Sequence, residues 1–388
     1  MKLAQNLNNL GTESAFSVLA EAKALEAKGH PMIHLGLGQP DFKTPKHVVE
    51  AAKKALDDGH HGYVMSNGIP ECREAVTRWI KKRYDADIDA ERILIMPGGK
   101  PTMSYAIQCF GEPGAEIIHP TPAFPIYESM INYTGSTPVP YDLTEDKDLK
   151  FDPDKILSLI TDKTRLLILI NPNNPTGSFV EKPVIDYFAK ELEKHPHVTI
   201  LSDEIYSRQI FDYKEMPSFF HYEALKDRLI VLEGWSKAYS MTGWRLGWSY
   251  WPKEMVAHVN KLLINSVSCV NAAAQFAGIA ALDGPDDSIN DMLDKFTLRR
   301  NLIHKGLNDL PGIECSLPGG AFYAFPKVKG TGMTGAEFCK KAMHEAGVAI
   351  VPGTAFGKTC QDYVRFSFAA SRDNIQQALE NIGKMLSK

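Results

Sequence analysis

The sequence has no run of apolar residues long enough to cross a membrane. A membrane-spanning helix needs about 20 consecutive, mostly apolar residues, and every apolar stretch of this 388-residue chain is shorter. The first 30 residues also lack the unbroken apolar core of a signal peptide, because Glu13, Glu21, Lys23 and Glu26 interrupt it. We therefore expect a cytoplasmic protein that does not bind a membrane.

Cysteine is sparse and scattered, and no pair has the Cys-x-x-Cys spacing of a zinc or redox site. This pattern predicts mostly buried free thiols in a reducing compartment, and no bound metal. The six cysteines are Cys72, Cys109, Cys269, Cys315, Cys339 and Cys360.

A strong charge of either sign is also lacking. The chain has 43 Lys and Arg residues against 47 Asp and Glu residues, which gives a net charge of −4. Polyanions are bound by strongly basic surfaces, so this balance argues against nucleic acid or an anionic membrane as a partner. Hydrophobic residues make up 44% and charged residues 23% of the chain, as in ordinary globular proteins, and the length favours two domains.

What the sequence does contain is an alternation of short apolar runs with helical stretches between about residues 46 and 250. This alternation is typical of an α/β fold, in which helices wrap a mainly parallel sheet. The runs that we interpret as strands are Ile93–Met96, Glu116–Ile118, Leu166–Ile170, Val198–Leu201 and Leu229–Leu232.

Candidate site residues follow each of these runs directly. In open α/β sheets ligands bind beyond the carboxyl ends of the strands. We therefore expect the residues that directly follow the five runs, at the strand exits, to line one shared pocket. In chain order the exits carry Gly98-Gly99-Lys100, Phe124, the segment 171–177, Asp203 and Ser236-Lys237.

After about residue 285 the pattern changes. Residues 289–310 and 335–347 have helical spacing, and Tyr363 to Ala369 alternates like a strand. A last helix begins after Ser371, which is a suitable N-cap. Its expected buried stripe is Ile375, Ala378, Leu379, Ile382 and Leu386. We interpret this part of the chain as a smaller α+β domain.

Lys237 lies directly after the fifth run, among the small and aromatic residues of segment 236–247. Burial or a nearby cation lowers the pKa of a lysine, and an amine that forms an imine needs that lowered pKa. Arg245, eight residues later, is able to supply the cation or to bind an anion. The spacing alone fits two solvated loop charges equally well, so both interpretations stay open at this point.

Asp203 closes the fourth run and precedes Glu204. An acid at this edge can pair with Arg245, with a metal or with the protonated ring nitrogen of a cofactor. A metal is the weakest of these options, because no histidine lies near either acid in sequence. Capping a following helix is an equally sound role for Asp203.

The segment Gly98–Lys100 stands between the first run and a helix expected over 102–110. Glycines at such a place let backbone N–H groups approach a phosphate at the positive end of the helix. The segment is not a Walker A loop, because Pro101 stands where that motif has Ser or Thr. The pair Gly36 and Gly38 is no dinucleotide fingerprint either, because no helix follows it. Either glycine pair also suits a simple turn.

Together these parts match the needs of pyridoxal 5'-phosphate: a lysine for a Schiff base, an acid for the ring nitrogen, a glycine turn with an arginine for the phosphate, and an aromatic ring to stack on the pyridine. Five motifs also occur in an order that closely resembles the class I and II aminotransferases of the aspartate aminotransferase superfamily, fold type I. These motifs are NPNNPTG (171–177), SDEIY (202–206), SKAYSMTGWRLG (236–247), PGTAFG (352–357) and YVRFSFA (363–369).

The resemblance implies a division of the chain and a set of residue roles. A large cofactor-binding domain would span residues 46–285 and a small domain 286–388, with the segment 1–45 packing on the small domain. Lys237 resembles the lysine that forms the aldimine, and Asp203 the partner of the pyridinium nitrogen. The partners of the ring hydroxyl would be Asn174 and Tyr206, and the phosphate cradle would be Gly99, Lys100 through its backbone, Ser236 and Arg245.

Four further residues gain roles from the resemblance. Phe124 falls where the family stacks an aromatic ring on the cofactor. Tyr63 resembles the tyrosine that reaches the phosphate of the neighbouring subunit, which implies a homodimer with shared active sites. Arg365 resembles the arginine that holds the substrate α-carboxylate, together with Asn174 and the Gly38 backbone. From the strand pattern alone, Arg365 would be interpreted as an exposed arginine.

The implied function is an aminotransferase that moves an amino group from an L-amino acid to a 2-oxo acid in a ping-pong cycle, with aspartate or a broader set of donors. One branch of the family binds a distal carboxylate with an arginine of the partner subunit, whereas this chain has no Lys or Arg between Lys261 and Lys295. Carbon–sulfur β-lyases share the fold and cofactor and are one rival. A nucleotide-binding or non-catalytic α/β protein is the other.

Overall fold

A seven-stranded sheet forms the centre of the structure, a computed structural model that describes residues 1–146 and 148–388. Its strands lie in the order β2-β8-β7-β6-β5-β3-β4, and only β8 runs against the others. The strands are β2 (Ile93–Met96), β3 (Glu116–Thr121), β4 (Thr137–Asp142), β5 (Thr164–Ile170), β6 (Thr199–Asp203), β7 (Leu229–Gly234) and β8 (Gly247–Tyr250).

All five predicted strands are confirmed, and two more were missed. β4 was missed because Pro138 and Pro140 obscure its pattern, and prolines of this kind are tolerated on an edge strand. β8 was missed because its four residues directly follow a segment that was interpreted only as a motif. Because β2 and β7 both pair antiparallel with β8, all the predicted strands end at the same edge of the sheet.

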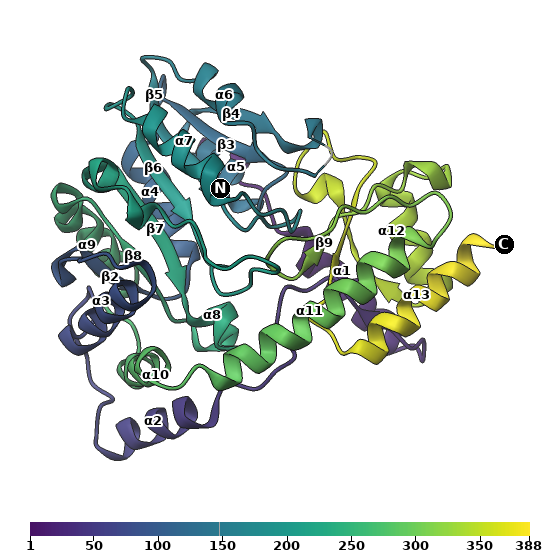
Figure 1. Ribbon diagram of the computed structural model, residues 1–388, viewed down its shortest axis with the longest axis horizontal. Helices are drawn as coiled ribbons and strands as arrows, with labels where there is room; N and C mark the ends of the chain where they lie inside the picture. Colours follow the sequence, from purple (N-terminus) through teal and green to yellow (C-terminus); the bar gives the residue numbers. More distant parts are fainter. Residues whose placement is uncertain (147) are drawn as a thin grey trace.

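Helices cover both faces of this sheet (Figure 1). The strands are therefore apolar almost throughout, and alternate side chains enter the two cores. One core contains residues of α2, α3, α6, α7 and α10, and the other contains residues of α4, α5 and α9. The helices are α2 (Lys46–Asp57), α3 (Pro70–Tyr84), α4 (Lys100–Phe110), α5 (Ile126–Thr134), α6 (Pro153–Ser158), α7 (Lys182–Leu192), α8 (Trp235–Ala238), α9 (Lys253–Val267) and α10 (Ala272–Asp283).

The C-terminal part has a hydrophobic core of its own. Figure 1 shows the C-terminal part beside the large sheet. Helix α11 begins close to α10 and extends into the C-terminal part. Its small sheet has the order β11-β12-β9, and a separate parallel pair joins β1 to β10. The elements are α11 (Asp287–Asn308), β9 (Tyr323–Ala324), α12 (Gly335–Ala346), β10 (Val348–Ala349), β11 (Val351–Pro352), β12 (Val364–Ser367) and α13 (Arg372–Leu386).

The last helix follows the predicted pattern. The Ser371 side chain accepts a hydrogen bond from the backbone of Asn374 and so caps α13. Three residues of the expected stripe are buried and the other two pack against the same core while partly exposed. The buried ones are Ile375, Ala378 and Ile382, and the partly exposed ones are Leu379 and Leu386.

The N-terminal segment contacts both parts of the molecule. α1 (Ser14–Glu26) and β1 (Ile33–His34) lie on the C-terminal part, where β1 pairs with β10. Earlier residues bond instead to α5: the Gly11 N–H donates to Ser129 Oγ at 2.8 Å, and Asn9 Nδ2 donates to the Asn132 carbonyl at 3.3 Å. The division at residues 45 and 285 stays a prediction.

The cysteines are free, and most of them are buried, as the sequence predicts. The buried ones are Cys72, Cys315, Cys339 and Cys360. Within residues 1–146 and 148–388, no helix combines the length and the apolar character needed to cross a bilayer.

Candidate active site

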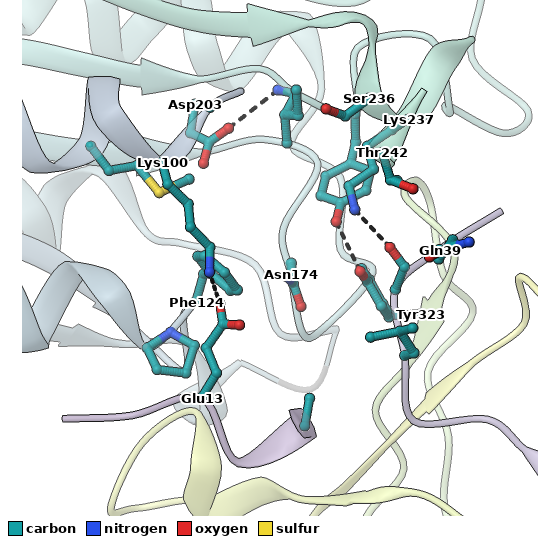
Figure 2. Close-up of a pocket in the computed structure, with 18 of the residues that line it drawn as sticks. Glu13, Gln39, Lys100, Phe124, Asn174, Asp203, Ser236, Lys237, Thr242 and Tyr323 are labelled. Carbon is teal, nitrogen blue, oxygen red and sulfur yellow. Dashed lines mark hydrogen bonds and ion pairs between the residues drawn. The ribbon is translucent and has the colours of Figure 1, made fainter. Parts of the chain in front are cut away.

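A cavity of about 470 Å³ opens at the carboxyl edge of the large sheet, and residues of that sheet and of the C-terminal part line it. The five strand exits meet there, as Figure 2 shows for Lys100, Phe124, Asn174, Asp203 and Lys237. Every predicted site residue except Tyr63 lines the cavity. The lining members of that set are Gly38, Gly99, Lys100, Phe124, Asn174, Asp203, Tyr206, Ser236, Lys237, Arg245 and Arg365.

Lys237 lies in α8, the short helix that starts directly after β7. Its Nζ donates a hydrogen bond of 2.6 Å to the Gly38 carbonyl, and the rings of Tyr206 and Phe322 lie 6.0 and 5.7 Å from the ammonium. The side chain is half-buried in the cavity wall. The interpretation of Lys237 as a solvated loop charge is therefore wrong.

Burial, together with the nearby charges of Arg365 and Arg245, lowers the pKa of Lys237 to about 8. Desolvation disfavours the ammonium, and nearby cations repel it. A neutral amine is therefore accessible near physiological pH, which is what a nucleophilic lysine and a proton acceptor both require.

Asp203 is the last residue of β6 and is buried. Tyr127 Oη donates to Asp203 Oδ2 at 2.6 Å, and the Ile205 N–H donates to Oδ1 at 3.2 Å. Burial raises the pKa of Asp203 to about 6, although these two hydrogen bonds and the charge of Lys237 act against that rise. Asp203 does not cap a helix, because the next helical turn after β6 begins at Phe219.

The turn after β2 brings a glycine and an arginine into contact. Gly98 has φ +89°, and a Cβ placed on it would lie only 2.2 Å from Arg245 Nη2. Arg245 Nη1 donates to the Thr242 carbonyl at 2.8 Å, which directs the guanidinium over this turn. Gly99 is the N-cap of α4 and has no side chain to cap it. The cationic group and the positive end of a helix thus meet in one corner, beside Ser236.

Arg365 is 3% exposed, so the interpretation as an exposed strand arginine is wrong. Its Nη1 donates to Asn174 Oδ1 at 2.9 Å and its Nη2 to the Gly36 carbonyl at 2.6 Å. The rings of Tyr323 and Phe356 lie 4.5 and 4.6 Å from the guanidinium carbon. Arg365 Nε is buried and has no hydrogen-bond partner among the residues that the structure describes. A buried donor of this kind needs an acceptor, and a carboxylate would supply one.

Two tyrosines close the wall beside Arg365. Tyr206 and Tyr323 share a hydrogen bond of 2.9 Å between their hydroxyls. Burial raises the pKa of Tyr206 well above 10. A Cβ on Gly38 would lie 1.9 Å from the Tyr323 hydroxyl, so only glycine fits at that position beside Lys237.

Tyr63 is the exception among the predicted residues. It is 92% exposed and does not line the cavity of its own chain. Its predicted role therefore depends entirely on a second subunit.

Sequence reasoning missed several lining or supporting residues. They come from segments far from the strand exits or carry no local signal. Tyr323 could have been found, because it lies in the glycine-containing segment 318–325 between two recognised motifs. Tyr127 lies three residues after Phe124, but nothing in that spacing links it to Asp203. The missed residues are Glu13, Tyr127, Tyr323 and Phe356.

Comparison with known proteins assigns the chain to a family. The aminotransferase class I and II family matches residues 30–382. The chain is 36% identical over 365 residues to the aspartate aminotransferase of Pyrococcus horikoshii, covering 93% of this chain and 92% of that protein. The structure of the aspartate aminotransferase from Rhizobium meliloti superposes with a TM-score of 0.94 at 30% identity, over 100% of this chain and 99% of that one.

A relative with a different activity is similar to this chain at a comparable level of identity. The aromatic aminotransferase from Pyrococcus horikoshii superposes with a TM-score of 0.88 at 33% identity, covering 95% of this chain and 98% of that one. The chain therefore belongs to the class I and II aminotransferases. It is a pyridoxal-phosphate-dependent aminotransferase of fold type I, which confirms the predicted family, fold, cofactor and enzyme class and excludes the nucleotide-binding alternative.

Proposed function

We propose that this aminotransferase moves the amino group of an L-amino acid to a 2-oxo acid in a ping-pong cycle, with aspartate as the donor or as one of a broader set. The observation that carries this proposal is the presence of Lys237, Asp203 and Arg365 in one cavity. The first is an amine with a pKa of about 8, the second is a buried acid, and the third is a buried guanidinium with a free N–H.

The donor set of the cavity fits pyridoxal phosphate. Arg245, Ser236 and the first backbone N–H groups of α4 would hold the phosphate. Asp203 would pair with the ring nitrogen, Asn174 and Tyr206 would bond the ring hydroxyl, and Phe124 would cover one face of the ring. Asn174 suits this role because its Oδ1 already accepts from Arg365, which leaves its Nδ2 to donate. When bound, the cofactor withdraws electrons from the substrate Cα.

Lys237 would take and return protons beside the substrate Cα. The Gly38 carbonyl holds its Nζ at 2.6 Å on the Arg365 side of the cavity. With a pKa of about 8, the amine exists in both protonation states near pH 8 and is able to act in both directions of transfer.

Arg365 would fix the substrate by its α-carboxylate. Its bonds to Asn174 and Gly36 and its two ring contacts hold the guanidinium in one orientation before substrate arrives. A preorganised guanidinium binds a planar carboxylate through two parallel hydrogen bonds. Because every L-amino acid and 2-oxo acid carries this group, Arg365 would not discriminate among them.

The active unit would be a homodimer. Tyr63 supports this proposal, because an aromatic ring 92% exposed in one chain is available to a neighbouring subunit. A mixture of Lys237→Ala and Tyr63→Phe subunits would form some dimers with one intact site. Activity of the mixture above that of either variant alone would support shared sites, and no gain would contradict them. A cytoplasmic location stays a prediction from the scattered free cysteines.

The test of the function is a donor and acceptor profile of the purified enzyme. Each L-amino acid is supplied with 2-oxoglutarate, and both the new 2-oxo acid and glutamate are quantified. We expect equal amounts of the two products and parallel lines in double-reciprocal plots. Release of ammonia, pyruvate and a thiol from cysteine S-conjugates without any acceptor would instead indicate a carbon–sulfur β-lyase.

A further inference from the structure

An ion pair forms part of the wall of the active-site cavity. Glu13 Oε1 lies 2.8 Å from Lys100 Nζ, and both side chains line the cavity. The rings of Phe124 and Phe16 lie 5.6 and 5.8 Å from the same ammonium. Figure 2 shows the pair on the side of the cavity away from Lys237, with Asn174 between them. This wall therefore combines two aromatic rings with a lysine whose charge is already balanced.

Among the residues that the structure describes, Lys100 is the only ion-pair partner of the Glu13 carboxylate. Glu13 is the N-cap of α1, yet its side chain makes no capping hydrogen bond with that helix. The segment before it is tied to α5 through Gly11 and Ser129, and α1 lies on the C-terminal part. Glu13 therefore lies between a segment that bonds to α5 and a helix that packs on the C-terminal part, and its carboxylate contacts Lys100. Its side chain is only 14% exposed, whereas that of Lys100 is 45% exposed.

Among the described residues, four cations line the cavity, and only Lys100 has a side chain without a role in the proposed function. Lys237 would carry the cofactor, Arg245 would hold its phosphate and Arg365 would hold the α-carboxylate. Lys100 would serve the cofactor only through its backbone. Its ammonium is therefore the charge that a second carboxylate of a substrate would meet, and the sequence from 262 to 294 supplies no other.

The charge of Glu13 acts on the rest of the site as well. It raises the pKa of Lys237, against the burial and the cations that lower it. It also favours the charged form of Arg365. Glu13 is therefore part of the cavity's electrostatic field, and a substrate carboxylate entering beside it would be repelled.

We propose that Glu13 is a specificity-determining residue, which occupies Lys100 in place of the distal carboxylate of an acidic substrate. The enzyme then favours amino acids with aromatic or aliphatic side chains, which lie against Phe16 and Phe124 and leave the ion pair intact. Aspartate and glutamate are disfavoured, because they must separate Glu13 from Lys100 first. This inference rests on the proposed aminotransfer and, within the broader set of donors, ranks aspartate below amino acids with aromatic or aliphatic side chains.

The test uses the loaded enzyme and its Glu13→Gln variant, with Glu21→Gln as a matched control. Glu21 is an exposed residue of α1 that lies beside His344, so its removal changes the charge of the same helix away from Lys100. Values of kcat/KM are measured for aspartate and for phenylalanine. Dissociation constants of succinate and of 3-phenylpropanoate are measured from the change in cofactor absorbance, without turnover.

Glu13→Gln should raise kcat/KM for aspartate and tighten succinate binding by about tenfold, because the like-charge repulsion is removed. Phenylalanine and 3-phenylpropanoate should change by less than about twofold, and Glu21→Gln should change none of the four values. In the double variant Glu13→Gln, Lys100→Met the gain for aspartate and succinate should disappear. Such a loss is expected only if Lys100 receives the second carboxylate.

Two results would overturn the proposal. One is a Glu13→Gln variant whose succinate affinity is unchanged, and the other is an equal change for the dicarboxylate and the monocarboxylate. Failure of the proposed function would look different, since no donor would then transfer its amino group to 2-oxoglutarate with any variant. The two inhibitor affinities would still decide the role of Glu13 in that case.

Discussion

The Tyr127 hydroxyl donates a 2.6 Å hydrogen bond to Oδ2 of Asp203, although the two residues are 76 positions apart. Tyr127 lies in α5 and Asp203 ends β6, so the bond crosses from the helix layer to the edge of the sheet. It opposes the rise in the pKa of Asp203 that burial causes. Tyr127 therefore helps keep the acid ionised, as a partner of a protonated ring nitrogen must be.

Replacing Tyr127 by Phe should move the acidic limb of the kcat/KM profile to higher pH. A hydrogen bond to a charged group contributes about 1.5–3 kcal/mol, which would raise the pKa of Asp203 by about one to two units, so the loss near pH 7 should be about twofold to fifteenfold. Raising the pH should restore most of it, because Asp203 is then ionised without Tyr127. Asp203→Asn is the reference, with a loss of several orders of magnitude at every pH. A flat loss for Tyr127→Phe across the pH range would show that Tyr127 acts in another way.

The glycine turn after β2 allows a matched comparison. Gly98 and Gly114 have nearly the same φ, +89° and +94°, but only Gly98 has Arg245 where its Cβ would be. Alanine imposes similar backbone strain at both, about 1–2 kcal/mol. Gly98→Ala should weaken cofactor binding by at least about tenfold in titrations of the apoenzyme, and Gly114→Ala should leave it unchanged. Equal losses for both variants would mean that strain, and not the Arg245 cradle, is responsible.

Arg365→Lys should weaken all amino-acid donors and 2-oxo acid acceptors alike. A lysine ammonium lacks the paired, planar N–H groups of the guanidinium, and the α-carboxylate is common to every substrate. The measurement is kcat/KM for one acidic, one aromatic and one aliphatic donor. The order of the three should be kept while each value falls. A loss confined to the acidic donor would assign Arg365 to the side-chain carboxylate instead.

Two buried glutamates close to the site residues in sequence, Glu204 and Glu233, predict how the stability of the fold depends on pH. Burial raises the pKa of Glu204 to about 7 and that of Glu233 to about 8. Glu233 accepts hydrogen bonds from the Gly234 N–H, at 2.8 Å, and from the Ser207 hydroxyl. A glutamate in the unfolded chain has a pKa near 4.3, so it releases its proton at a lower pH than these two buried glutamates do. The folded state therefore holds more protons between about pH 4.5 and 8, and stability should fall as the pH rises through this window.

Glu233→Gln should flatten this dependence, because glutamine stays neutral throughout. Each proton difference contributes a slope of up to about 1.4 kcal/mol per pH unit. Urea unfolding of the wild type and of Glu233→Gln between pH 5 and 8.5 measures the slope, and Glu21→Gln serves as an exposed control. A variant as pH-dependent as the wild type would show that Glu233 is ionised in the folded protein.

Much of the fold was predictable because its central strands are buried on both faces. Segments such as Leu166–Ile170 are apolar throughout and end at abrupt polar exits, so they stand out in the sequence. β4 contains two prolines, and β8 contains Gly247 and Ser249, so neither produces such a run. The sequence pattern reveals a buried strand only where its buried positions are filled by large apolar residues.

The residues of the site also differ in whether the sequence alone could predict them. Residues at strand exits, such as Asp203 and Lys237, were predictable because the topology of a parallel sheet brings the exits together. Glu13 and Tyr127 were not, because each reaches the cavity or its acid through a tertiary contact with a distant segment. Arg365 was assigned correctly to the pocket only through the resemblance, since strand alternation does not reveal which face is covered.

The role of Lys237 is the central claim, and one measurement tests it most directly. Borohydride reduction of the loaded enzyme makes any bond between the cofactor and a lysine permanent, and mass spectrometry of its peptides then locates that bond. We predict the added mass on Lys237 in the wild type, and no labelled lysine in an inactive Lys237→Ala variant. Labelling of another lysine, such as Lys100, in the wild-type enzyme would contradict the account.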